Sequence, residues 1–486
     1  MPASSPSVLP DCRLLVAGEW MTTGDTLDVL DKFRLEPCWR LHRATRDHVR
    51  NAVARADAAF REGAPGANER GAILDRAAAL IEQRADEIVA TMQREAGFTQ
   101  SDAAGEVRRS VQTFRLSAEE ARRLAGDVIP LEGAPQQGGR FGFTLRVPLG
   151  VVCAITPFNA PLNTVSHKVA PALAAGNAVV LKPSSHTPMT ANLLAEILLA
   201  AGLPPGMLAV LHGGAQVVQW LLEEPQVRFY AFTGSTEVGR DIHARAGLRR
   251  TQMELGSIAF TALAADADLD AALPKIIGAG YRKAGQVCTS VQILLVHESL
   301  RAQVEERMTA LVRALPYGDP TTPGMVVGPV ISEEAAQRIE QWVEQAVAQG
   351  ARRLAGGPRQ GAVVPPTLLT DIGDGMTVSC QEIFGPVVCI ESFSSIEQVI
   401  ARINGTPFGL ATGFFTNRLN DAFALARRLQ VGGVHINETS SSRVDMMPYG
   451  GSKDSGFGRE GPHYAVREMT EERMVTITAL PQRQGT

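Results

Sequence analysis

The sequence predicts an α/β protein whose parallel sheets carry helices on both faces. From about residue 147, short β-branched runs alternate with helical segments, and a second such series runs from about 257 to 454. Strand–helix alternation at this spacing is typical of doubly wound parallel sheets. The chain has 486 residues, which is enough for two or three domains with well-buried cores.

The order of the elements follows from hydrophobic periodicity and from turn residues. Ahead of the sheets, a short hairpin is expected around 14–21, and helices at 47–62, 66–97 and 102–125. In the first series the expected strands are 151–155, 178–181, 208–211 and 228–232, and the expected helices are 162–175, 189–201 and one from Ser235. In the second series we expect a strand at 291–296, helices at 268–282, 300–314 and 333–349, and a final strand at 473–480.

The composition is that of an ordinary globular protein and gives no indication of nucleic-acid or membrane binding. Lys and Arg number 47 against 51 Asp and Glu, a net charge of −4. The first residues lack the basic and apolar regions of a secretory signal, and no apolar run reaches the length of a membrane helix. The six cysteines are scattered without metal-ligand spacing, so we expect free thiols, no metal and a cytoplasmic location.

A cysteine in the stretch 281–290, YRKAGQVCTS, is the leading candidate nucleophile. Cys288 lies between small and polar residues, directly before an apolar run. A thiolate attacks carbonyl carbons, but a single cysteine is as often inert core, so the residue alone decides nothing. Glu254, in MELGS at 253–257, is a candidate base for the same site, although the sequence itself cannot place it beside the cysteine.

Two segments compete as the dinucleotide signal. Residues 456–461 match GxGxxG but follow a polar run instead of a strand, so we interpret the match as chance. Residues 232–239, FTGSTEVG, lead a strand into a helix, where free backbone N–H groups suit a pyrophosphate, or where Ser235 simply caps the helix. Lys182 and Asn159 each follow an expected strand, where parallel sheets bind ligands; a surface lysine and a turn-capping asparagine are the plainer alternatives.

Together these stretches resemble the aldehyde dehydrogenase superfamily over nearly the whole chain. The matching motifs, in family order, are TPFNAPLN at 156–163, HKVAPALAAGNAVVLKPS at 167–184, FTGSTEVG at 232–239, MELGS at 253–257, GQVCTS at 285–290, EIFGPVV at 382–388 and PYGGSKDSGFGREG at 448–461. Several independent motifs in one order make the resemblance specific. It implies two doubly wound parallel-sheet domains with a small β oligomerisation arm, and the oxidation of a small aldehyde to its carboxylate with NAD or NADP.

The resemblance also implies how the chain is divided. Residues 1–125 and 149–256 would form the NAD(P)-binding domain, and residues 257–454 the catalytic domain with the nucleophile. Residues 126–148 and 465–486 would form the arm and the C-terminal strand, so a homodimer or homotetramer is expected.

The resemblance assigns roles residue by residue. Cys288 would attack the aldehyde, Glu254 would activate the water that hydrolyses the thioester, and the Asn159 amide with the Cys288 backbone N–H would bind the oxyanion. Lys168 and Glu460 would support proton transfer. The implied cofactor-binding residues are Ile155, Thr156, Pro157, Lys182, Ser184, Ser185, Gly214, Phe232, Gly234, Ser235, Leu255, Glu382 and Phe384.

The sequence departs from the family at the cofactor's adenosine ribose. Members strict for NAD usually carry Glu directly after Lys-Pro-Ser, where this chain has Ser185. A carboxylate there would repel a 2′-phosphate and a hydroxyl would not, so both NAD and NADP are expected to work.

One branch of the family narrows the expected substrate. Details such as ELGS and GQVC resemble lactaldehyde, phosphonoacetaldehyde and sulfoacetaldehyde dehydrogenases, which favours a small anionic or hydroxy aldehyde. In that branch Arg109, Ser442 and Arg443 would line the substrate tunnel, where an arginine can hold an anionic tail. The alternative is that the arginines form surface ion pairs, Arg109 with Glu106 and Arg443 with Asp445.

Two other functions stay open at this point. A CoA-acylating member of the family typically lacks the base that Glu254 supplies. A catalytically inactive binding homologue has no need to keep Cys288, Glu254, Asn159 and Lys182 together.

Overall fold

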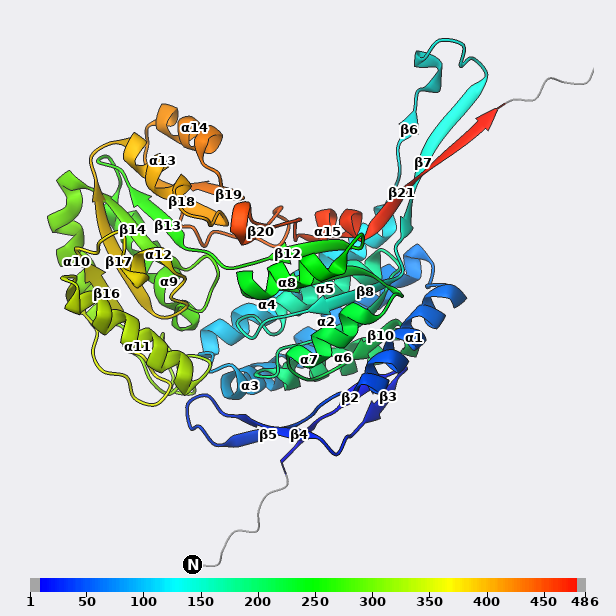
Figure 1. Ribbon diagram of the computed structural model, residues 1–486, viewed down its shortest axis with the longest axis horizontal. Helices are drawn as coiled ribbons and strands as arrows, with labels where there is room; N and C mark the ends of the chain where they lie inside the picture. The colour runs from blue at the N-terminus through cyan, green and yellow to red at the C-terminus, as the bar shows by residue number, and fades with distance from the viewer. Residues whose placement is uncertain (1–8, 479–486) are drawn as a thin grey trace, which may run out of the picture.

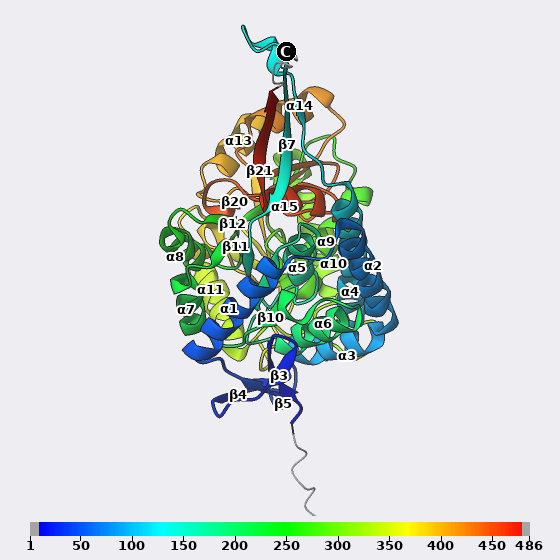
Figure 2. The same cartoon turned by 90° about the vertical axis from the view of Figure 1, so that its right-hand side faces the viewer.

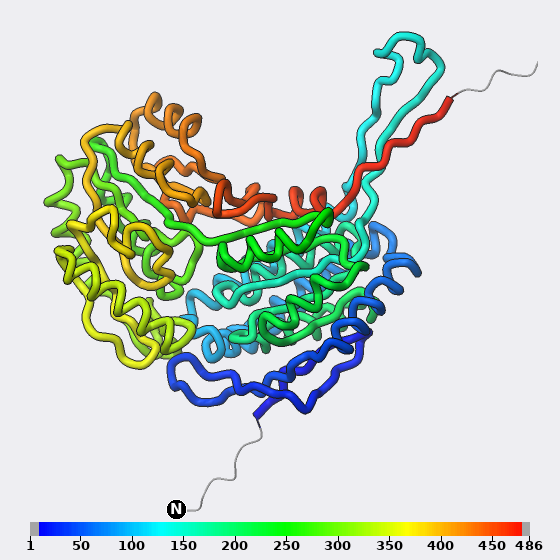
Figure 3. The backbone as a smooth tube through the Cα atoms, viewed as in Figure 1, coloured from blue at the N-terminus to red at the C-terminus, as the bar shows by residue number. Residues whose placement is uncertain are grey.

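The computed structural model describes residues 9–478, which form two large sheets, a projecting three-stranded arm and a small N-terminal sheet (Figure 1). Figure 3 shows the path of the chain: the first sheet is built, then the second, and the last part returns to the first before entering the arm. No helix within residues 9–478 combines the length and the apolar character that a membrane crossing requires.

The first sheet has a parallel centre and antiparallel edges. In spatial order its strands are β20 (Gly456–Phe457), β12 (Arg250–Glu254), β11 (Val227–Thr233), β8 (Val151–Ile155), β9 (Ala178–Lys182), β10 (Leu208–Val210), β2 (Leu14–Val16) and β3 (Glu19–Met21). The strands from β12 to β10 are parallel to their neighbours, whereas β20, β2 and β3 pair antiparallel. The predicted strands and the β2–β3 hairpin are therefore confirmed, and the GxGxxG match lies on and after an antiparallel edge strand instead of opening a helix.

Helices cover the first sheet in two groups. The first group is α1 (Arg46–Glu62), α7 (Ala215–Glu223) and α8 (Thr236–Ala246), and the second is α5 (Asn163–Ala174) and α6 (Pro188–Ala200), backed by α2 (Ala67–Gln83), α3 (Ala85–Glu95) and α4 (Gln100–Arg123). The prediction of one helix over 66–97 is wrong, because the chain leaves helical geometry at Arg84, which ends α2 and begins α3.

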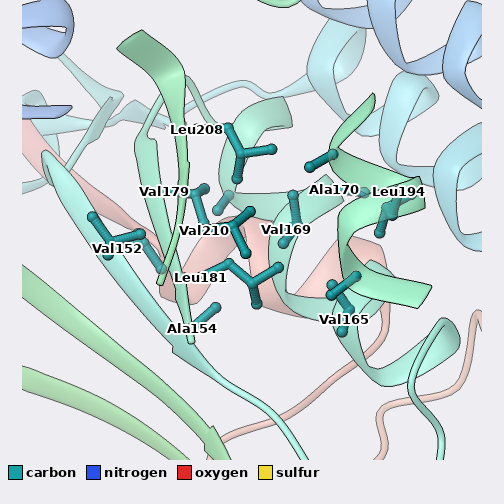
Figure 4. Packing of buried hydrophobic residues seen from close by; sticks show 14 of the residues in the cluster. Val152, Ala154, Val165, Val169, Ala170, Val179, Leu181, Leu194, Leu208 and Val210 are labelled. Atoms are coloured by element: carbon teal, nitrogen blue, oxygen red, sulfur yellow. The ribbon is translucent and has the colours of Figure 1, made fainter. Parts of the chain in front are cut away.

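The central strands of the first sheet are apolar along their whole length because they pack into a core beneath the helices α5 and α6. Figure 4 shows the packing of Val152, Ala154, Val179, Leu181, Leu208 and Val210 from the strands with Val165, Val169, Ala170 and Leu194 from the helices. Because helices lie over both faces, every residue of β8 and β9 is buried.

The second sheet is parallel apart from one edge strand. In spatial order its strands are β15 (Arg352–Ala355), β16 (Thr367–Thr370), β17 (Val387–Phe393), β14 (Val291–His297), β13 (Ala259–Leu263), β18 (Ala411–Phe415) and β19 (Gly433–Ile436), with β15 antiparallel. Its helices are α9 (Leu269–Tyr281), α10 (Arg301–Arg313), α11 (Glu333–Ala348), α12 (Thr377–Cys380), α13 (Ile396–Asn404) and α14 (Leu419–Arg428). The three helices and the strand predicted here are confirmed to within one or two residues at each end.

The arm consists of β6 (Val128–Ile129), β7 (Arg140–Pro148) and β21 (Thr470–Thr478), and α15 (Pro462–Glu468) leads into it. β21 pairs antiparallel with β7 along its whole length, and the two paired strands project from the rest of the molecule (Figure 2). The predicted C-terminal strand is confirmed up to residue 478; its last positions, 479–480, lie outside the described residues.

The segment 31–41 belongs to the small N-terminal sheet, where it forms the turn after β4 (Thr26–Leu30) and most of β5 (Pro37–His42). β4 and β5 form a hairpin that pairs with β1 (Asp11–Cys12). The turn between them carries Leu35 at a positive φ of 59°. This hairpin lies beside the first sheet's helices and supplies no residue to the cavity described next.

Candidate active site

A cavity of about 530 Å³ opens where the carboxyl ends of the first sheet's strands face loops of the second sheet. Because these strands are parallel, their ends bring residues distant in sequence to one edge. The predicted site residues that line it are Arg109, Pro157, Asn159, Gly234, Ser235, Glu254, Leu255, Cys288, Glu382, Phe384, Arg443 and Glu460. The predicted residues outside its lining are Ile155, Thr156, Lys168, Lys182, Ser184, Ser185, Gly214, Phe232 and Ser442.

Cys288 is presented by a tightly turned loop between α9 and β14. A single 3₁₀ turn, Arg282–Gly285, contains three successive left-handed residues: Lys283, Ala284 and Gly285, with φ of 51°, 52° and 70°. A Cβ atom on Gly285 would lie 2.0 Å from the Gly385 carbonyl oxygen, so only glycine fits. Non-glycine residues at positive φ cost about 1–3 kcal/mol each, and such strain is typical of functional loops.

The Cys288 thiol faces the cavity and has one polar partner there. Its Sγ lies 2.8 Å from the Tyr449 hydroxyl. Burial raises the pKa of the Cys288 thiol to about 11, the hydrogen bond from Tyr449 lowers it, and the nearby Glu254 carboxylate raises it. The environment therefore favours the neutral thiol, which must lose its proton before the sulfur attacks.

Glu254 supplies a buried carboxyl at the end of β12. It is 3% exposed, and neither carboxyl oxygen has a hydrogen-bond partner among the described residues. Burial, and then the negative charge of Glu460, raise the pKa of Glu254 well above its usual value. An unpartnered carboxyl with a raised pKa, facing a cavity that contains a thiol, is suited to take up a proton.

Asn159 follows β8 and reaches the loop ahead of the cysteine. Its Nδ2 donates a hydrogen bond to the Gln286 carbonyl oxygen at 2.9 Å. An amide nitrogen carries two protons, so a second donor remains for a ligand oxygen in the cavity.

Lys283 and Glu106 form a buried brace that sequence analysis did not single out. The Lys283 ammonium donates to Glu106 at 2.7 Å and to the Asn159 carbonyl oxygen at 3.0 Å, and it lies 4.6 Å from the Phe98 ring centroid. The Lys283 backbone N–H also donates to Asp102 on α4. The cysteine loop, the Asn159 segment and α4 are thus tied together at one point.

Lys168 and Glu460 form a second buried ion pair, with Lys168 Nζ 3.0 Å from Glu460 Oε1. Arg443 donates to the other carboxylate oxygen of Glu460 at 2.8 Å. These two cations hold the pKa of Glu460 far below its usual range despite burial. Glu460 is therefore ionised, which explains why its charge acts on Glu254.

The ion pairs expected from sequence neighbours, Glu106 with Arg109 and Arg443 with Asp445, are wrong. Arg109 donates to Asp445 at 2.7 Å, and Arg443 donates to Glu460. Two nitrogens of Arg109 donate to the two Asp445 carboxylate oxygens, and Asp445 also accepts hydrogen bonds from His167 and Asn163.

The prediction for Ser442 also needs correction, because its neighbour Ser441 lines the cavity instead. Ser441 Oγ accepts a hydrogen bond from Arg282 at 2.6 Å. Arg282 lines the same cavity six positions before Cys288, and it forms no ion pair with a carboxylate within residues 9–478. Sequence analysis quoted Arg282 in the cysteine stretch without assigning it a role.

The edge beside the cavity fits a nicotinamide dinucleotide. Lys182, at the end of β9, has no side-chain hydrogen-bond partner in the described chain, and burial lowers its pKa to about 8. The hydroxyls of Thr156 and Thr233 are buried and unpartnered at neighbouring strand ends. Unpaired donors of this kind match the hydroxyls and phosphates of such a ligand.

Glu382 and Phe384 lie where this edge meets the cavity. Glu382 accepts a hydrogen bond from the Ser257 N–H at 3.0 Å, and a Cβ atom on Gly256 would lie 2.9 Å from its other oxygen. Burial raises the pKa of Glu382 to about 7. The Phe384 ring packs edge-to-face on Phe158, 5.9 Å between centroids, so the aromatic wall is preformed.

Two parallel sheets whose facing ends surround a thiol, an unpartnered carboxyl and an amide have the architecture of an α/β enzyme. The adjoining edge of the sheet, with its unpaired lysine and hydroxyls, is suited to bind a nucleotide. The fold and the site together therefore define a nucleotide-dependent α/β enzyme.

Comparison with known proteins specifies the family. The profile described as "Aldehyde dehydrogenase family" matches residues 20–475. A 3-sulfolactaldehyde dehydrogenase from Priestia aryabhattai is 45% identical over 466 residues, which cover 96% of this chain and 97% of the relative. The chain belongs to the aldehyde dehydrogenase family.

Solved structures agree with this assignment. Aldehyde dehydrogenase 21 from Physcomitrella patens, in complex with the reaction product succinate, has a TM-score of 0.94 at 38% identity, covering 97% of this chain and 99% of its own. Glyceraldehyde-3-phosphate dehydrogenase GapN from Methanocaldococcus jannaschii, complexed with NADP, has a TM-score of 0.90 at 34% identity, covering 94% and 100%. The predicted fold, family and branch are confirmed, and the protein is an oxidoreductase that acts on aldehyde groups with NAD or NADP.

Proposed function

We propose that Cys288 is the nucleophile with which this enzyme oxidises a small aldehyde to its carboxylate. The observation that carries the proposal is the cavity itself, where the thiol, the unpartnered Glu254 carboxyl and the Asn159 amide lie together. Glu254 acts as the base, and the Asn159 amide with the Cys288 backbone N–H receives the oxyanion.

The chain's own groups carry the covalent steps. The Cys288 thiol loses its proton to solvent and its sulfur adds to the aldehyde carbon, which gives a thiohemiacetal whose oxygen the Asn159 amide stabilises. When bound, the nicotinamide supplies the acceptor for the hydride that leaves this carbon. Glu254 then takes a proton from water as that water attacks the resulting thioester, and Cys288 is regenerated.

Lys168 and Glu460 support proton transfer in this proposal by holding a fixed negative charge beside Glu254. Lys182 and Glu382 would hold the cofactor riboses, Phe384 would lie by the nicotinamide, and the segment around Gly234 would border the pyrophosphate. The unpaired Lys182 ammonium and the preformed Phe384 wall support this arrangement.

We further propose that the preferred substrate carries an anionic tail held by Arg282. Four arginines line the cavity. Arg109 and Arg443 are already paired with carboxylates, and Arg338 donates to the Ile383 carbonyl oxygen and lies over the Trp342 ring. Arg282, six positions before Cys288, bonds the Ser441 hydroxyl. A half-buried guanidinium with no carboxylate partner is suited to a carboxylate or sulfonate. Relatives named for 3-sulfolactaldehyde, and a structure holding succinate, support an anionic substrate.

One experiment tests the proposed function as a whole. Formation of NAD(P)H is followed with a panel of small neutral and anionic aldehydes, with and without CoA. We expect turnover that does not depend on CoA and releases the free acid. A strict requirement for CoA would instead show an acylating enzyme, and no turnover with any aldehyde would favour an inactive homologue.

Replacing Ser185 with glutamate is expected to shift cofactor preference from NADP toward NAD. The Ser185 hydroxyl donates to the Gly213 carbonyl oxygen at 3.0 Å, at the edge where we place the adenosine ribose. A carboxylate there repels the 2′-phosphate by about 1–3 kcal/mol, so KM for NADP should rise about five- to hundredfold while KM for NAD changes little.

Ser299→Glu serves as the matched control. It adds the same charge at an exposed residue of the turn Glu298–Leu300, which follows β14 of the second sheet. If NADP binds equally well to the wild type and to Ser185→Glu, the ribose does not lie at this position.

The arm is expected to hold a homodimer or homotetramer together. Its strands expose a set of apolar side chains that an isolated monomer would leave in water: Val128, Phe141, Leu145, Met474 and Ile477. Sedimentation should give a multiple of the 51.9 kDa chain, and Ile477→Asp should shift the enzyme toward monomers. The control Leu311→Asp changes an exposed leucine on α10 and should leave the assembly intact. A wild-type monomer at micromolar concentration would contradict the proposal.

We propose the same division of the chain into domains as the sequence predicted, with 1–125 and 149–256 binding the cofactor and 257–454 holding the nucleophile. The separate buried cores of the two large sheets support it. A cytoplasmic location is also proposed, and the absence of a disulfide among the six cysteines is consistent with it.

A further inference from the structure

Tyr449 contacts the reacting sulfur directly. Its hydroxyl lies 2.8 Å from Cys288 Sγ, and both side chains line the cavity. Two backbone hydrogen bonds hold Tyr449 in place: its N–H donates to the Glu460 carbonyl oxygen at 3.1 Å, and the Glu460 N–H donates back at 2.7 Å. The hydroxyl is therefore aimed at the thiol by a fixed backbone and not by a mobile loop.

The Arg443 guanidinium lies over the ring of Tyr449. Its guanidinium carbon is 3.7 Å from the Tyr449 ring centroid, while its terminal nitrogen donates to Glu460. Glu460 is held in turn by Lys168. A cation on the ring face makes the phenol a stronger hydrogen-bond donor, because it withdraws electron density from the ring and oxygen.

We propose that Tyr449 is a catalytic residue whose hydroxyl donates a hydrogen bond to the Cys288 thiolate, and that Arg443 is a positioning residue that acts through the Tyr449 ring. The proposal rests on Cys288 being the nucleophile. No atom is transferred to Tyr449: the thiol proton leaves to solvent, and the phenol keeps its own proton while it donates a hydrogen bond to the sulfur.

The direction of the hydrogen bond follows from the environment of both groups. Burial raises the pKa of Tyr449 well above its usual value, so the phenol keeps its proton. Once the thiol is ionised, the sulfur can only accept, and the phenol is the donor. Burial and the charge of Glu254 oppose formation of the thiolate, whereas the hydrogen bond from Tyr449 favours it. The charge of Arg443 also favours the thiolate, and that of Glu382 opposes it, so Tyr449 is the group that stabilises the thiolate by direct contact.

The test compares Tyr449→Phe with the wild type by the rate at which iodoacetamide alkylates Cys288, mapped by peptide mass between about pH 6 and 10. Phenylalanine fills the same space, so only the hydroxyl is lost. We expect a rate about tenfold lower near neutral pH, and a difference that shrinks as the pH rises toward full ionisation of the thiol. The kcat profile for aldehyde oxidation should move to higher pH in parallel.

Control variants separate this role from a merely structural one. Tyr464→Phe, a half-buried tyrosine on α15 outside the cavity, should keep the wild-type profile. Arg443→Gln should shift the alkylation profile in the same direction by a smaller amount. Its effect should be smaller still in the Tyr449→Phe background, where only the direct effect of the Arg443 charge on the thiolate is lost.

Each result has a defined meaning. An alkylation profile in Tyr449→Phe that matches the wild type, or a loss that is equal at every pH, overturns the role of Tyr449. If Tyr449→Phe does not stay folded, an unshifted profile in Arg443→Gln overturns it. If Cys288 of the wild type is not alkylated at all while other cysteines are, the proposed nucleophile fails instead, so the two failures are distinguishable.

Discussion

Replacing Cys288 with alanine is expected to lower kcat for aldehyde oxidation by roughly 10⁴-fold or more, because no other group in the cavity can form the covalent intermediate. The thiol is the only sulfur among the residues that line the cavity. The measurement is steady-state formation of NAD(P)H with the best aldehyde of the panel. Cys380→Ala removes an exposed cysteine outside the cavity and should retain wild-type turnover. A Cys288→Ala enzyme with near-normal kcat would contradict covalent catalysis.

Replacing Arg282 with glutamine is expected to lower kcat/KM for an anionic aldehyde by about ten- to hundredfold, through the loss of a charge-assisted pair with the substrate's tail. The physical reason is that Arg282, unlike Arg109 and Arg443, has no carboxylate partner in the described chain and lies in the loop that presents Cys288. A neutral aldehyde of equal length, measured on the same variant, is the internal control and should lose little. Thermal unfolding of the variant checks that the buried site survives the substitution.

Arg443→Ala provides the contrast. Arg443 is bound to Glu460 and stacked on Tyr449, so its loss should lower kcat/KM for neutral and anionic aldehydes alike. If Arg443→Ala selectively impairs the anionic substrate and Arg282→Gln does not, the anion site lies at Arg443 and our assignment to Arg282 is wrong.

The sequence was sufficient for the architecture because strand and helix periods are local. The runs at 151–155 and 178–181 are apolar at every position, which is how a strand buried on both faces must look, and both became central strands. The break at Arg84 was missed because the apolar period continues almost unchanged from α2 into α3, and only the backbone angles of one residue differ.

The site was harder to predict because its contacts join positions far apart in the chain. The expected pair of Arg109 with Glu106 used helical spacing, yet each residue found a partner from another element: Asp445 and Lys283. Tyr449 was quoted within a motif but not recognised, since nothing in PYGG shows that the hydroxyl meets the thiol. The sequence could indicate which residues of a motif belong to the site. It could not indicate which hydrogen-bond and ion-pair partners those residues find on other helices, strands and loops.

The most direct test of the central claim is the intact mass of Glu254→Gln enzyme after a single addition of aldehyde and NAD(P)⁺. Without the base, hydrolysis of the thioester should stall after one burst of NAD(P)H, because glutamine cannot take the proton from water. The account predicts an added mass equal to the acyl group, mapped to the peptide that contains Cys288. A burst with no acyl adduct, or an adduct on a different residue, would contradict it.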